Sequence, residues 1–276
     1  MKPELILEKA KEIAIKLAKD SEEDKEFNPL VKDFLANLEE ILKKRTPTNY
    51  LLLPETKEHP ELITNLTRLT YGPEVQKIAE KLGLNLRNNE QGYVGNITFK
   101  QAEQIALGLE GLIETPSLFV EKLRILKSGK GYDAQGNKHD PKRLERAFKE
   151  ITEVSSFWRA QWLNHSYSQK DGIIQVTYHK FVNGKLEQVT EPLDEDTLMQ
   201  DKLPRISLED YVENPTSQGL PRKSVKEGSL WYWHPREGGV AGFVADADGA
   251  GLYCNGNPRC SYSVVGVAVA KIFHKK

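Results

Sequence analysis

The chain has 276 residues, and its 39 basic and 40 acidic residues give a formal net charge of -1. This balance favours neither nucleic acid nor anionic lipid as a partner, and no apolar run approaches the roughly 20 residues of a membrane span. The start, MKPELILEKAKEIAIKLAKD, carries charges at helical spacing and lacks the apolar region of a signal peptide. We therefore expect one large or two modest domains, no nucleic-acid partner, no membrane span and a cytoplasmic location, with surface display by another route left open.

The first 83 residues are expected to form a small all-α region. Apolar residues recur at helical spacing over positions 6–17 and again over 31–42. After the proline-containing stretch TPTNYLLLPETKEHP, shorter helices are expected over Glu61–Leu69 and Pro73–Leu82, the second of which Gly83 ends. No motif here points to chemistry. We expect an accessory unit that positions the rest of the chain or engages a cellular partner.

The remaining residues, 84–276, have the pattern of an α+β domain. Thr98 is the expected N-cap of one helix, Thr115 is a second N-cap with proline after it, and the same arrangement recurs in HDPKRLERAFKEI. The stretch GIIQVTYHKFVNGKLEQVT has two β-rich runs on either side of an Asn-Gly pair, which is the strongest short hairpin signal. Trp158 and Trp162, four residues apart, are expected to be core aromatics beneath this hairpin.

Several motifs suggest chemistry but lack part of the pattern that it requires. SGKGYDAQGN lacks the GK[ST] ending of a phosphate loop, and DADG lacks the third acidic position and closing Glu of a calcium loop. His165, His179 and Glu187 are not at metal-ligand spacing. Cys254 and Cys260 could form a redox or copper pair, but two unpaired buried thiols are favoured. We therefore expect no enzymatic activity, no catalytic residue, no metal site and no cofactor.

The segment from Val240 to Ala270 differs in composition from the rest of the chain. Its 31 residues include no Lys, Glu, Gln, Met or Trp, the amino acids that NNC codons cannot encode. A row of AAC codons whose adenines had been randomised would encode a segment that lacks these five amino acids. At period two, one register is small or apolar and includes Phe243 and Leu252, whereas the other is chemically mixed, as on a strand that faces solvent or a ligand. An amphipathic meander with a neutral outer face is the alternative, and it leaves the codon pattern unexplained.

Four stretches carry a resemblance to a known family: ITFKQAEQIALGLEGLIETPSLFVEKLRILKSGK, FWRAQWLNHSYS, TSQGLPRKSVKEGSLWYWHPREGGVAGF and SYSVVGVAVAK. They resemble the variable proteins of diversity-generating retroelements. The resemblance implies a C-type lectin fold for residues 84–276 and a hypervariable segment over about 234–265, whose codons are replaced by an error-prone reverse transcript. The implied function is selective binding of a variable ligand, expected to be a protein, without catalysis.

The resemblance implies that the ligand-binding residues are those of the mixed register and one residue upstream: His234, Gly242, Val244, Asp246, Asp248, Gly251, Tyr253, Asn255, Asn257, Arg259 and Tyr262. Trp231 and Trp233 lie outside the NNC vocabulary and are expected to be scaffold. Calcium-mediated sugar binding is not expected, because the sequence has no EPN, QPD or WND triplet. Two alternatives stay open, an enzyme of the formylglycine-generating type on a related fold and a phage receptor-binding or structural protein.

Overall fold

The computed structural model describes residues 9, 12–13, 33–37, 49–89, 92–153, 158–202 and 205–273. The two helices expected over positions 6–17 and 31–42 lie for the most part outside these residues, and the short described parts of them are helical. None of the described helices combines the length and the apolar character that crossing a membrane requires.

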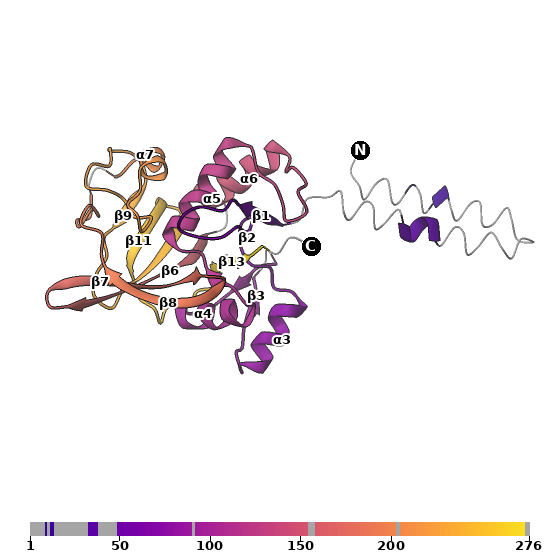
Figure 1. The fold of residues 1–276 in the computed structure, drawn as a ribbon, viewed down its shortest axis with the longest axis horizontal. Coiled ribbons are helices and arrows are strands. Elements are labelled where there is room, and N and C mark those ends of the chain that lie inside the picture. Colours follow the sequence, from indigo (N-terminus) through magenta and orange to yellow (C-terminus); the bar gives the residue numbers. More distant parts are fainter. Residues whose placement is uncertain are drawn as a thin grey trace, which may run out of the picture.

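The described residues form a mixed α+β fold (Figure 1). Its helices are α3 (Pro73–Lys81), α4 (Phe99–Gly108), α5 (Pro116–Ser128), α6 (Pro141–Thr152) and α7 (Leu208–Glu213). Its strands are β1 (Tyr50–Leu53), β2 (Leu62–Asn65), β3 (Arg87–Asn88), β4 (Val94–Gly95), β5 (Leu112–Ile113), β6 (Arg159–Lys170), β7 (Ile173–Val182), β8 (Lys185–Pro192), β9 (Trp231–Trp233), β10 (Val240–Asp246), β11 (Gly249–Gly256), β12 (Val265–Val267) and β13 (Val269–Ile272).

The larger sheet has the strand order β8-β7-β6-β10-β11-β9, and β12 pairs with β6 in parallel. A four-stranded sheet has the order β1-β2-β13-β5, so it joins strands from both ends of the range 49–273, and β3 and β4 form a small ribbon. In Figure 1 β7 and β8 run along the lower left of the body, whereas α5 and α6 lie together near β1.

The described residues before position 84 are not all helical. The helix expected over Glu61–Leu69 is wrong, because Leu62–Asn65 forms β2, which pairs with β1 on one side and β13 on the other. Leu51, Leu53 and Leu62 are fully buried in the same hydrophobic cluster as residues of α5 and β6. This segment is a strand because it pairs with other strands, one of which is far away in the sequence. A short apolar run does not reveal such pairing. The residues from 49 onward thus share a core with those after 84.

The helix boundaries predicted from capping residues are confirmed. Helix α3 ends just before Gly83, whose φ of +65° is the left-handed conformation that closes many helices. Thr98 caps α4 in a capping box with Gln101. Thr115 and Asp140 cap α5 and α6, and each is followed by proline in the first helical turn.

The hairpin predicted from the Asn-Gly pair is β7–β8. Asn183 and Gly184 both have positive φ, 49° and 75°, which is the requirement of a type I′ turn. Trp162 of β6 is buried, but its ring packs edge-to-face on Phe99 of α4, at 6.0 Å, and not beneath the hairpin. Trp158 is 57% exposed, so the expected core position is wrong for it. Because Trp158 precedes the first residue of β6, it lies outside the sheet and is not covered by it.

A charged pair lies inside the core. Glu114, directly after β5, and Lys122 of α5 are both fully buried, with 2.6 Å between Lys122 Nζ and Glu114 Oε2. The same carboxylate accepts hydrogen bonds from Thr64 Oγ1 of β2 and from Gln161 Nε2 of β6, the latter at 3.3 Å. Burial lowers the pKa of Lys122, and the charge of Glu114 opposes this effect. Because buried charges require partners in fixed positions, the network holds β2, α5 and β6 in one arrangement.

Replacing Lys122 by Met should destabilise the protein strongly, because Glu114 then stays buried without its cation. We expect the free energy of unfolding in urea to fall by about 3–5 kcal/mol, and Glu114→Gln added to Lys122→Met to restore part of this loss. Lys149→Met, which breaks an exposed ion pair with Glu145, is the control and should leave the midpoint unchanged. Equal midpoints for Lys122→Met and the control would contradict this role of the pair.

Candidate functional site

The residues of the mixed register lie on one face of the larger sheet. Across β10 and β11, Gly242 is paired with Tyr253, and Val244 is paired with Gly251. Because paired residues of neighbouring strands point to the same face, these positions form one surface. β9 extends the surface beyond β11, and β6 extends it beyond β10.

The alternate residues of the same strands form part of the core, as predicted. Phe243, Leu252 and Cys254 are at most 2% exposed, and the ring of Phe243 lies 4.9 Å from that of Phe119 in α5. The division between a packed register and an outer register therefore holds for the central part of both strands.

Two glycines of the outer register are buried, contrary to the expectation that this register is exposed. A Cβ atom on Gly242 would lie 3.5 Å from the ring of Trp162, and one on Gly251 would lie 2.7 Å from the ring of Tyr253. Aromatic side chains from the same or the neighbouring strand cover both backbones. A larger residue at position 251 would have to displace Tyr253.

An aromatic row crosses β9 and β11 on this face. Arg205 lies over the ring of Trp231 at 3.6 Å, Trp231 and Trp233 are 5.5 Å apart, and Trp233 stacks on Tyr253 at 4.1 Å with an interplanar angle of 10°. The indole Nε1 of Trp231 donates to the backbone oxygen of Asp248 at 3.0 Å. Stacking and cation–π contacts of this kind fix ring positions, so the two tryptophans hold Tyr253 in place.

An apolar cavity of about 260 Å³ opens on the face beside this row. Six of the predicted ligand-binding residues line it: Gly242, Val244, Asp246, Tyr253, Asn257 and Tyr262. Trp158, Trp162 and Cys260 also line it, and the sequence did not identify them as site residues. The spacing of the two tryptophans was the available signal, but spacing does not distinguish a core side chain from one that lines a cavity.

The other predicted residues do not line the cavity. The ring of His234 contacts Asp201, with Nδ1 3.1 Å from Oδ1, and Arg236 binds the second oxygen of the same carboxylate at 2.7 Å. Asp248 lies in the exposed turn between β10 and β11, and Arg259 is exposed in the turn that Asn257 Oδ1 stabilises. Asn255 is half-buried on β11. These residues, and Gly251 with them, therefore lie outside the cavity lining.

The two cysteines are free thiols in different surroundings. Cys254 is fully buried on the core face, and burial raises its pKa to about 12 although a hydrogen bond with Tyr167 opposes the shift. Cys260 is half-buried and lines the cavity, with its Sγ 4.0 Å from the hydroxyl of Tyr262. The expectation of unpaired thiols is confirmed, whereas full burial is confirmed only for Cys254.

Among the described residues, no three His, Cys, Asp or Glu side chains gather closely enough to hold a metal ion. Comparison of the chain with models of protein families, with curated proteins and with solved structures finds no match. The candidate site is therefore defined by its geometry, an apolar cavity beside an ordered aromatic row.

Substitutions in the two registers of β11 should differ in their effect on stability. Leu252→Ala should lower the free energy of unfolding by about 2–5 kcal/mol through the core cavity that it leaves, whereas Asn255→Ser should change it by less than about 0.5 kcal/mol. Tyr253→Ser should fall between them, since the stacking on Trp233 contributes about 0.5–1.5 kcal/mol beyond buried area. Urea denaturation measures all three. A loss at Asn255 as large as that at Leu252 would show that the faces are assigned wrongly.

Proposed function

We propose that this chain is a non-catalytic binding protein that selects a protein ligand with the face formed by β9, β10 and β11. We also propose that residues 84–276, together with β1 and β2, have a C-type lectin-like fold and that about 234–265 vary between relatives, as in the variable proteins of diversity-generating retroelements. The observation that carries the proposal is that six residues of the mixed, NNC-type register line one apolar cavity.

One register forms the core and the other lines the cavity, and this separation supports variation at this face. Phe243, Leu252 and Cys254 fill the core, so they stay constant while outer residues change. On the opposite face, the cavity is lined by Val244, Asn257 and other residues of the outer register. Because exposed substitutions change stability by only about 0.5 kcal/mol, variation at the outer positions other than the buried Gly242 and Gly251 and the stacked Tyr253 is compatible with a stable fold.

The size and chemistry of the cavity favour a protein ligand. Its volume of about 260 Å³ is below the usual range of small-molecule pockets, about 300–1,000 Å³, and suits one large apolar side chain. Trp158, Tyr253 and Tyr262 supply the aromatic area that is enriched where binding energy concentrates. Asp246 and Asn257 add polar groups among the lining residues, which suits a surface that must adapt to different partners.

The placement of the cysteines weighs against the enzyme alternative. A formylglycine-generating type of site uses a cysteine pair, but Cys254 belongs to the core face and Cys260 to the cavity. The thiol of Cys254 has a pKa raised to about 12, so it is protonated at neutral pH and is a poor nucleophile. Binding is the function that this geometry supports better.

A displayed library tests the binding role of the cavity. Randomising Val244, Tyr253, Asn257 and Tyr262 with NNC codons should yield variants that bind different purified protein targets at micromolar concentration or below. Because the core register is unchanged, these variants should still fold, and their melting temperatures should fall no further than that of Tyr253→Ser.

The control library randomises four exposed residues of β8: Lys185, Glu187, Gln188 and Thr190. It should yield few or no specific binders, since β8 has no aromatic row. If both libraries yield binders equally often, or if the cavity library yields none, the assigned face is not a binding surface.

The origin of the variation is tested in the DNA next to the gene. We expect a near-copy of the codons for Val240–Ala270 that differs from them almost only at adenines, close to a reverse transcriptase gene. Sequencing the flanking DNA decides this point. If no such copy exists, the segment is an ordinary amphipathic meander that happens to contain no Lys, Glu, Gln, Met or Trp.

A further inference from the structure

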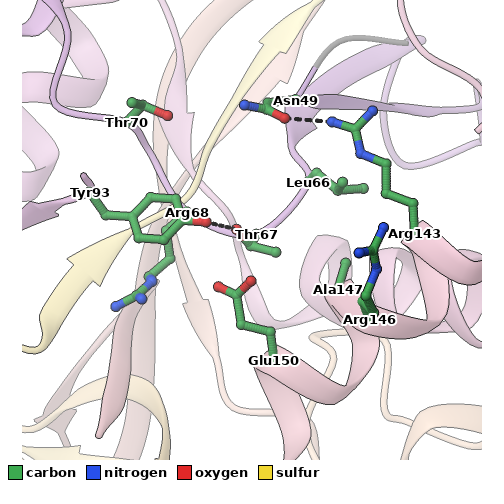
Figure 2. Close-up of a pocket in the computed structure, with 10 residues that line it drawn as sticks. All are labelled: Asn49, Leu66, Thr67, Arg68, Thr70, Tyr93, Arg143, Arg146, Ala147 and Glu150. Atoms are coloured by element: carbon green, nitrogen blue, oxygen red, sulfur yellow. Dashed lines mark hydrogen bonds between the residues drawn. The ribbon is translucent and has the colours of Figure 1, made fainter. Parts of the chain in front are cut away.

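A second pocket, of about 290 Å³, lies between α6 and the segment that follows β2 (Figure 2). Helix α6 lines it with Arg143, Arg146 and Glu150, which are spaced so that they lie on one helix face. The segment after β2 adds Thr67 and Arg68. Nothing in this pocket belongs to the binding face described above, and its chemistry is different.

The lining residues have an excess of positive charge, three arginines against one carboxylate. Arg143 Nη2 donates to Asn49 Oδ1 at 2.5 Å, and Arg146 Nε donates to the backbone oxygen of Lys142 at 3.3 Å. The contact of Arg146 orients its guanidinium group through a neutral oxygen, whereas the carboxylate of Asp133 also acts on Arg143. Among the described residues, Arg146 forms no ion pair with a carboxylate. Burial, and after it the charge of Arg146, lowers the pKa of Arg143, as expected for like charges held close together.

Behind the pocket, a second arginine layer increases the positive potential. Arg159 is almost fully buried, and its Nη1 lies 3.6 Å from Glu150 Oε1. Burial lowers the pKa of Arg159 to about 9, and the neighbouring charge of Arg68 acts in the same direction. The pKa of Arg68 is also lowered by burial, which Glu150 opposes. An anion bound in front of these groups would be attracted by four guanidinium charges, an attraction that Glu150, Asp133 and Glu114 partly offset.

We propose that this pocket binds a small molecule whose phosphate or carboxylate group pairs with Arg143 and Arg146 and whose hydroxyl or amine group donates to Glu150. Guanidinium groups recognise both oxyanions through paired N–H donors. In Figure 2 the carboxylate of Glu150 points into the space between Thr67 and Arg146, where it is placed to accept a hydrogen bond from a ligand.

The remaining lining residues fit a small polar ligand. The hydroxyl of Tyr93 accepts a hydrogen bond from Thr67 Oγ1 at 3.0 Å and can donate its own hydrogen. The volume, about 290 Å³, is also just below the usual range of small-molecule pockets, so it is the charged lining that favours a small anion and the volume that limits its size. A hydroxy acid or a sugar phosphate matches both the size and the arrangement of one acceptor beside a cationic wall.

Calorimetric titration of the full chain with ribose 5-phosphate and with malate tests this site and separates the phosphate from the carboxylate source. At least one of them should bind, and Arg146→Gln should weaken that binding roughly 10- to 100-fold, the usual contribution of a hydrogen bond to a charged group. Because Arg146 is exposed, the variant should fold normally. Arg143→Gln is a second variant with the same expectation.

Lys142→Gln is the matched control, since Lys142 is an exposed residue of α6 outside the pocket lining and its loss changes net charge equally. It should alter the binding less than twofold. If neither probe binds, the proposed site does not exist. If Lys142→Gln weakens binding as much as Arg146→Gln, the probes bind only through the general positive charge of this surface.

Glu150→Met, which removes both the charge and the acceptor oxygens, tests the second half of the assignment. It should tighten the binding of inorganic phosphate, because it removes a repulsive charge, and should weaken the binding of ribose 5-phosphate or malate relative to inorganic phosphate. Equal changes for all three probes would show that Glu150 accepts no hydrogen bond from the ligand. These outcomes do not depend on whether the β9–β11 face binds a protein.

Discussion

Glu114 and Lys122 carry opposite charges inside a core that excludes water, and neither could stay ionised there without the other. The carboxylate of Glu114 also accepts hydrogen bonds from Thr64 and Gln161, so both of its oxygens have partners. Glu114 and its three partners come from four different segments, so the charges are satisfied only when β2, β5, α5 and β6 are all in place. Hydrophobic burial alone tolerates many arrangements, whereas this network tolerates few. It therefore accounts for the defined position of β6, the strand that forms the floor of the proposed binding face.

Strand β6 transmits this constraint to the candidate site because its side chains alternate between two faces. Gln161 points to the core, where it also accepts a hydrogen bond from Arg159 at 2.6 Å. The next residue, Trp162, points to the opposite face and forms a wall of the cavity, and its indole donates to the backbone oxygen of Ile97. One wall of the cavity is thus formed by Trp162, whose position is set by the core. Trp162 lies outside the segment that we propose is variable.

Local signals in the sequence predicted the helix starts and the hairpin, because Thr98, Thr115 and the Asn-Gly turn act through neighbouring backbone atoms. The strand over Leu62–Asn65 was missed because it is defined by β13, about two hundred residues away in the chain. The register of β10 and β11 was predictable from alternation, but the burial of Gly242 under Trp162 depends on the packing of another strand. The pocket in Figure 2 was missed for the same reason, since its arginines come from separate segments.

The contacts that hold the end of the proposed variable segment are made mainly to its backbone. Asn96 donates its N–H to the oxygen of residue 262, Phe99 donates to that of residue 258, and both Arg68 Nη1 and the N–H of Ala160 donate to that of residue 264. All four donors lie outside the segment, and every acceptor is a carbonyl that any amino acid supplies. Replacing side chains between 257 and 264 therefore leaves these hydrogen bonds available. A loop anchored in this way can present different side chains to the cavity while its path along the sheet is preserved, which is the property that a surface diversified by codon replacement requires.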